Sequence, residues 1–180
     1  MSTELNRVYD RGHEYEREYG NCAQCVLAAL SDFFHVQGDA VFKAATALSG
    51  GTAGMGDGNC GAYSGAVLAL GLMYGRERKD FANPRKARHA SDLARMLRSK
   101  FMKEYGGVTC HDVQRKVFGR TFNLQDRVDY QAFEEAGAHT EKCPDVVGKA
   151  ALWTAEIISN DSLDSSLGSS LDRSGKESEH

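Results

Sequence analysis

Apolar and polar positions along most of the chain follow the period of an α-helix. Between residues 3 and 19, apolar and small side chains recur every three or four positions with Asp, Glu and Arg between them, which predicts an amphipathic helix. Residues 22–34 are apolar on nearly every side and rich in alanine, so a central buried helix is expected there. A shorter helix is expected over residues 39–48.

A glycine-rich segment interrupts this pattern. Seven glycines fall between residues 50 and 65, which favours an extended, irregular loop. The loop leads directly into the apolar segment 66–75, whose second half has the character of a helix. A helix is therefore expected to emerge from the end of this loop.

The second half of the chain predicts three further helices, over residues 87–105, 110–118 and 144–158. The first and the last of these repeat apolar side chains at clear helical spacing. The intervening residues 119–142 are polar and mixed, and only a helical turn near residues 130–136 is expected there.

No part of the chain alternates apolar and polar positions between hairpin turns, so strands are not expected. The predicted fold class is all-α, a compact bundle of about five or six helices with a long glycine-rich loop. Residues 159–180 contain eight serines in 22 residues and no periodic apolar face, which predicts a disordered, serine-rich C-terminal tail. The chain is thus expected to form one helical domain over residues 1–158.

Charge and composition exclude several classes of function. The 22 basic and 25 acidic residues leave a net charge of −3, and no long basic stretch gives a reason to expect nucleic acid or an anionic membrane as a partner. The apolar runs are too short or too rich in glycine to span a bilayer, so membrane insertion is not expected. The N-terminal residues lack the apolar core of a secretory signal, and we therefore expect a cytoplasmic protein with reduced thiols.

Five cysteines are far fewer than a disulfide-stapled scaffold needs, which favours metal binding or redox chemistry. Four of them stand where a helix is expected to begin: Cys22, Cys60, Cys110 and Cys143. The unpaired N–H groups and the positive dipole end of a helix start favour the thiolate, which binds metals and attacks disulfides. Chance placement is the alternative. The fifth, Cys25, lies on an apolar face, where it either fills the core or adds a fifth thiol beside Cys22.

The expected helix caps differ among these cysteines. Asn21, Asn59 and Thr109 are good N-cap residues, and each directly precedes a cysteine, which then falls in the first helical turn. Cys143 precedes Pro144, a residue favoured at the first helical position, and is itself the expected cap. The separations of 38, 50 and 33 residues match no zinc-finger or ferredoxin spacing, so the fold must assemble any shared site.

The glycine-rich loop has two interpretations. It fits no phosphate-binding motif, and no lysine is placed to meet a phosphate. Glycines instead let the backbone wrap around Cys60 and direct N–H groups toward its sulfur or toward a cluster. The candidate cofactor-binding residues are Gly58, Gly61, Ala62 and Gly65. Tight helix packing is the alternative use of these small residues, and no Ser/His/Asp grouping or H-E-x-x-H motif suggests a catalytic residue.

Together these residues resemble the redox-active proteins named for the pattern C_GCAxxG_C_C. The segment 60–65, CGAYSG, fits the family's CGAxxG, and the resemblance covers residues 5–158 in the family's order. It implies that the four characteristic cysteines are those at the expected helix starts and that Cys25 is not among them. Related sequence occurs in the helical domain of split-Soret cytochrome c, beside c-type haems and an iron–sulfur cluster. Because this chain has no CxxCH, haem is not implied.

The resemblance implies redox activity at the four cysteines, and three uses of them stay open. The first is ligation of an iron–sulfur cluster for electron transfer, which favours a redox protein over a classical enzyme. The second is a thiol–disulfide redox protein with reversible cysteine pairs. The third is a structural zinc site in an interaction module. The redox partner protein is left unidentified, and homo-oligomerisation is left open.

Overall fold

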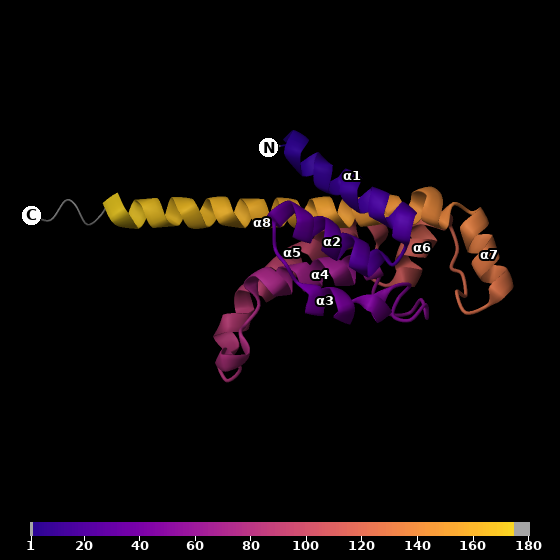
Figure 1. Cartoon of the computed structure of the whole chain (residues 1–180), viewed down its shortest axis with the longest axis horizontal. Helices are drawn as coiled ribbons and strands as arrows, with labels where there is room; N and C mark the ends of the chain where they lie inside the picture. The colour runs from indigo at the N-terminus through magenta and orange to yellow at the C-terminus, as the bar shows by residue number, and fades with distance from the viewer. Residues whose placement is uncertain (1, 175–180) are drawn as a thin grey trace, which may run out of the picture.

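The computed structural model describes residues 2–174, which form a bundle of helices and connecting loops (Figure 1). The helices are α1 (Ser2–Tyr19), α2 (Cys22–Phe34), α3 (Asp39–Ala44), α4 (Gly61–Tyr74), α5 (Arg88–Tyr105), α6 (Cys110–Phe118), α7 (Arg127–Glu135) and α8 (Cys143–Ser174). Three short 3₁₀ turns, η1 (Thr46–Leu48), η2 (Arg78–Asp80) and η3 (Pro84–Ala87), and a π-helical segment, η4 (Ala138–Lys142), lie between them. Within residues 2–174 the only extended pairing is one isolated bridge. The predicted all-α class is confirmed.

Helices α2 and α4 form the centre of the bundle. Both are apolar on nearly every side, and α1, α5 and α8 pack around them. Small residues allow the helices to approach closely. A Cβ atom on Gly65 of α4 would lie 2.2 Å from the carbonyl oxygen of Ala23 in α2, and one on Gly12 of α1 would lie 3.3 Å from Ala151 in α8. The backbones of these helices are therefore in near contact.

The two helices that are apolar on nearly every side, α2 and α4, are only 13 and 14 residues long. The longer α5 buries only the face predicted from its periodicity: Leu93, Leu97, Phe101 and Tyr105. None of the helices formed by residues 2–174 combines the length and the apolar character needed to cross a bilayer.

Residues 2–174 form eight α-helices where the sequence predicts about five or six, because short helices form in segments with weak periodicity. Helix α7 is the clearest case, since the sequence predicts only a turn there. The Asp126 carboxylate caps this helix by accepting hydrogen bonds from two backbone N–H groups, at 2.9 and 3.0 Å. Phe133 then packs against Phe118 and Phe122 in a small second core. Capping and tertiary burial stabilise a helix that periodicity alone does not indicate.

The last helix continues past the predicted boundary at residue 158. Helix α8 extends to Ser174 and projects beyond the other helices (Figure 1), although the composition of residues 159–174 predicts disorder. A helix already nucleated in the core adds further turns at little cost. The imidazole of His89 also contacts Asp161, with 3.1 Å between Nε2 and Oδ2, and this ties the extension to the start of α5. The remainder of the predicted tail, residues 175–180, lies outside the described residues.

Candidate functional site

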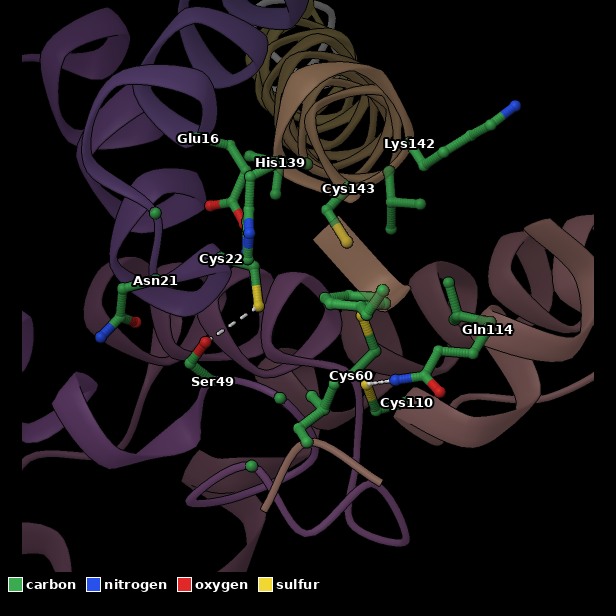
Figure 2. Close-up of a pocket in the computed structure, with 18 of the residues that line it drawn as sticks. Glu16, Asn21, Cys22, Ser49, Cys60, Cys110, Gln114, His139, Lys142 and Cys143 are labelled. Atoms are coloured by element: carbon green, nitrogen blue, oxygen red, sulfur yellow. Dashed lines mark hydrogen bonds and ion pairs between the residues drawn. The ribbon is translucent and has the colours of Figure 1, made fainter. Parts of the chain in front are cut away.

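Four cysteines face one cavity of about 520 Å³ inside the bundle (Figure 2). Cys22 comes from the start of α2, Cys60 directly precedes α4, Cys110 begins α6 and Cys143 begins α8. We refer to these as the four site cysteines. Cys60 is buried, and the other three are half-buried because they face the cavity. Four distant stretches of sequence thus contribute one thiol each to the same space.

A short backbone pairing brings two of these thiols together. The N–H of Cys60 donates to the carbonyl of Val108 (2.8 Å), and the N–H of Cys110 donates to the carbonyl of Gly58 (2.9 Å). These bonds flank the isolated antiparallel bridge between Asn59 and Thr109. The end of the glycine-rich loop is therefore held against the segment before α6, which places Cys60 and Cys110 side by side.

The glycine-rich loop begins with an unusual left-handed turn. Residues 50–54 all have positive φ, including Thr52 (67°) and Ala53 (52°), which carry a Cβ. A side chain in this region costs free energy because the Cβ crowds the carbonyl oxygen. The turn places Ser49 beside Cys22, with 3.6 Å between Oγ and Sγ. It also brings Gly51 against Cys110, since a Cβ on Gly51 would lie 2.9 Å from the Cys110 Cβ.

Changing Ala53 to glycine should stabilise the protein by about 0.5–1 kcal/mol, because relief of the left-handed strain exceeds the entropy that glycine adds to the unfolded chain. Gly51→Ala should act in the opposite direction, because its Cβ would lie 2.8 Å from the backbone of Gly56. Urea denaturation of both variants checks the pair. An Ala53→Gly protein less stable than the parent would contradict the prediction.

Two of the predicted helix caps are confirmed and two differ. The Asn21 side chain accepts the N–H of Gln24, and Thr109 forms a capping box with Asp112. Cys60 is itself the N-cap of α4, in place of Asn59. Cys143 is not a cap, because it has right-handed helical geometry and directly follows the π-helical segment η4. Its N–H is bonded to the carbonyl of Ala138, so the positive end of a free helix terminus does not act on this thiol.

The candidate cofactor-binding residues lie around the cavity and not on its wall. Gly58 holds Cys110 through the backbone bond described above. A Cβ on Gly61 would lie 2.3 Å from the Cys22 Sγ, so this glycine makes room for the sulfur. Ala62 is fully buried, and Gly65 packs against α2. These four small residues therefore position the cysteines through close packing.

Burial raises the pKa values of all four site cysteines. It raises the pKa of Cys22, Cys60 and Cys110 to about 12 in each case, and that of Cys143 well above its usual value. Neighbouring backbone N–H groups lower the pKa of Cys22 and Cys60 but do not outweigh burial. The expectation that the helix starts favour thiolates is therefore wrong, because desolvation exceeds the effect of the dipole. Without a bound cation the four groups are neutral thiols at pH 7.

The four site cysteines line the cavity as separate thiols. All five cysteines are free thiols. Nor does the described part of the chain place three or more His, Cys, Asp or Glu side chains closely enough to hold one metal ion. The four site cysteines thus share the wall of one cavity.

Gln114 is oriented toward one of the sulfurs. This side chain is 2% exposed, and its Oε1 accepts the N–H of Phe122 at 2.8 Å. That bond fixes the orientation of the amide, so Nε2 is the atom that donates to the Cys110 Sγ at 3.4 Å. Cys110 therefore has a dedicated hydrogen-bond donor.

Cys25 does not line the cavity. It is 3% exposed, and its thiol donates to the carbonyl of Gly20 at 2.8 Å. The structure thus places Cys25 in the core of α2, apart from the four site cysteines.

Two titratable residues on the cavity wall are missing from the sequence-based candidates. Glu16 of α1 is 1% exposed, and its Oε2 has no hydrogen-bond partner within the described residues. His139 of η4 lies beside it, with 4.0 Å between Nε2 and the Glu16 Oε1, and its Nδ1 contacts Glu134 at 2.6 Å. Figure 2 shows Glu16 and His139 near Cys22. Burial raises the pKa of Glu16 to about 7.

A signal for Glu16 does exist in the sequence. Val8, Gly12 and Glu16 are spaced by four residues, so the glutamate stands on the buried face of the first helix. No comparable signal indicates His139, because the polar segment 119–142 has no periodic face. This segment nevertheless forms a large part of the cavity wall, with Leu124 and Phe133 among its apolar side chains.

The metal-free protein should lose stability as the pH rises, and Glu16→Gln should abolish most of that loss. Folding raises the pKa of the Glu16 carboxyl from about 4.5, its value in the unfolded chain, to about 7. The resulting contribution to stability is fully present below pH 4.5 and is lost as the pH rises through about 7. The expected loss is about 3 kcal/mol. Urea denaturation across this pH range measures it, with the exposed Glu18→Gln as the control. Identical pH profiles for Glu16→Gln and the parent would contradict this assignment.

The fold and the cavity define an all-α protein with four cysteines around one internal site. The chain belongs to the family described as "Putative redox-active protein (C_GCAxxG_C_C)", whose model matches residues 20–157. The resemblance drawn from the sequence is thereby confirmed. Neither the curated proteins nor the solved structures contain a match to the chain.

Proposed function

We propose that this redox-active protein transfers electrons through an iron–sulfur cluster held by the four site cysteines. The observation that carries the proposal is the shared cavity of about 520 Å³, which four thiols from separate segments face. Four cysteine thiolates are the usual ligand set of such clusters. The family description supports redox activity in general, and the cavity supports this particular form of it.

The arrangement of the sulfurs favours a cluster over a single zinc ion. A structural zinc site needs all four ligands at about 2.3 Å from one point. The four site cysteines instead line a cavity of about 520 Å³. A cluster has several metal atoms, so its ligands surround a larger core.

The buried thiols also favour a metal centre over reversible disulfides. Thiol–disulfide exchange requires a thiolate, and burial raises the pKa of Cys22, Cys60 and Cys110 to about 12. A bound metal ion reverses the preference of the buried groups for the neutral thiol, because a coordinated thiol is deprotonated outright. The buried quartet is therefore poorly suited to free-thiol chemistry and well suited to ligation.

When bound, the cluster supplies one-electron redox chemistry, and the protein sets the conditions. The apolar wall formed by Val113, Phe118 and Leu124 limits contact with water. Gln114 donates a hydrogen bond to the Cys110 sulfur, and the Ser49 hydroxyl lies beside the Cys22 sulfur. Hydrogen bonds to cluster sulfurs and exclusion of solvent are two determinants of reduction potential.

The test is a visible absorption spectrum with iron, sulfide and zinc analysis on protein purified without oxygen. A coloured protein with iron and acid-labile sulfide in matching amounts is the expected result. A colourless protein that contains zinc would indicate a zinc site and contradict the cluster. A metal-free protein whose number of free thiols changes with redox poise would indicate reversible disulfides and contradict the cluster.

A further inference from the structure

The molecule has a strongly uneven distribution of charge. Residues 76–105 contain ten Lys and Arg against four Asp and Glu, whereas the rest of the chain has 12 basic and 21 acidic residues. A region with a net charge of +6 is thus joined to a remainder of −9, although the whole chain carries only −3. Such asymmetry points to an electrostatic interaction surface.

The structure concentrates part of this positive charge on a projecting arm. The segment between α4 and α5, which contains η2 and η3, extends away from the helical body (Figure 1). Phe81, between η2 and η3, is 75% exposed, and the guanidinium of Arg76 lies 4.8 Å from the centre of its ring. Lys86 and Asp80 form an ion pair at 3.1 Å that bridges the two 3₁₀ turns. The arm is thus braced by its own side chains.

Most of the cations on this arm are available for a partner. Arg78, Lys79 and Arg85 of the arm are exposed, as is Arg88, the first residue of α5. Among residues 3–162, whose side chains the structure describes, these four form no ion pair, in contrast to Lys86. Together with Phe81 they make up what we term the cationic surface.

We propose that the cationic surface docks a protein that presents a compact acidic patch. Charge complementarity requires an anionic partner. The acidic remainder of the chain repels an extended polyanion such as nucleic acid or an anionic membrane, whereas an acidic patch on a protein touches only the arm. An exposed aromatic residue among arginines is also the composition enriched in protein–protein interfaces.

The surface is distinct from the four-cysteine site. Cys60 lies at the start of α4 and the arm follows its end, so the 14-residue helix separates them by about 20 Å. Docking on the arm therefore does not depend on the identity of the cofactor. Its test can be made on the full-length protein as purified, whatever the cavity contains, and is independent of the proposed function.

The test compares two variants with the same change in net charge. Arg78→Glu/Lys79→Glu/Arg85→Glu reverses the arm, and Arg7→Glu/Lys116→Glu/Arg127→Glu reverses three exposed cations elsewhere. Binding of a labelled oligoglutamate peptide is followed by fluorescence anisotropy at low and moderate salt, with circular dichroism to verify folding. The arm variant should bind about tenfold more weakly or worse, and the second variant should keep most of its affinity.

Three outcomes would overturn the proposal. Equal losses of peptide affinity in the two variants would show that binding depends only on net charge. No loss of affinity in either variant would show that the arm does not bind the peptide. Single-stranded DNA of equal charge, and vesicles containing phosphatidylserine, serve as competing probes. Tighter arm-dependent binding of either one would identify a nucleic acid or a membrane in place of a protein. Phe81→Ser should weaken peptide binding without any change in charge, which separates a docking surface from simple attraction.

Discussion

Replacing Cys60 with serine should abolish binding of the proposed cluster. Serine oxygen is a poor ligand for the soft metal centres that thiolates bind. Cys60 is buried between the end of the glycine-rich loop and the start of α4. Metal content should fall to about one tenth of the parent value or less. Since binding of the metal contributes to folding, thermal stability should fall with it.

Cys25→Ser is the matched control for this change. Cys25 is as buried as Cys60, but it donates to the carbonyl of Gly20 and lies outside the cavity. A serine hydroxyl can make the same bond, so metal content should stay at the parent level. Metal retained by Cys60→Ser, or lost on Cys25→Ser alone, would contradict the choice of the four ligands. Serine substitutions of Cys22, Cys110 and Cys143 should each lower the metal content as Cys60→Ser does.

Gly65→Ala should destabilise the protein by about 3 kcal/mol or more. The added Cβ would lie 2.2 Å from the carbonyl oxygen of Ala23, a backbone atom that cannot move without the whole of α2. Helix α4 would have to shift away from α2, and with it the relative positions of Cys60 and Cys22. The midpoint of thermal unfolding should fall by about 5–10 °C, and metal affinity should fall as well.

Gly71→Ala tests the same substitution in the same helix with the opposite result. No atom lies within 4 Å of the position that its Cβ would occupy. Alanine in this exposed helical position should therefore raise stability by about 0.5–1 kcal/mol. Similar effects of the two substitutions would show that helix propensity, and not the contact between α2 and α4, governs the outcome at residue 65.

The segment 119–142 explains why the site could be predicted only in part. Its composition is polar and gives no periodic face, so the sequence predicts little more than one turn. In the structure it contributes Leu124, Phe133 and His139 to the cavity. These side chains act through contacts with distant elements, and such contacts leave no regular pattern in the local sequence.

By itself the sequence determined most of the main helices and singled out the four cysteines. Periodicity and capping act within one or two helical turns, which is why α1, α2, α5 and α6 lie close to their predicted ranges. The pattern CGAxxG and the order of the cysteines indicated the family, which the match over residues 20–157 confirmed. These features are local or linear, so they can be read along the chain.

Only the tertiary structure decided what surrounds those cysteines. Thiols separated by 38, 50 and 33 residues came to face one cavity through helix packing and a short backbone bridge. Burial reversed the expected direction of their pKa shifts, because desolvation depends on every element packed around a group. The orphan oxygen of Glu16 and the cationic surface arose in the same way, since burial and exposure depend on contacts between residues distant in sequence.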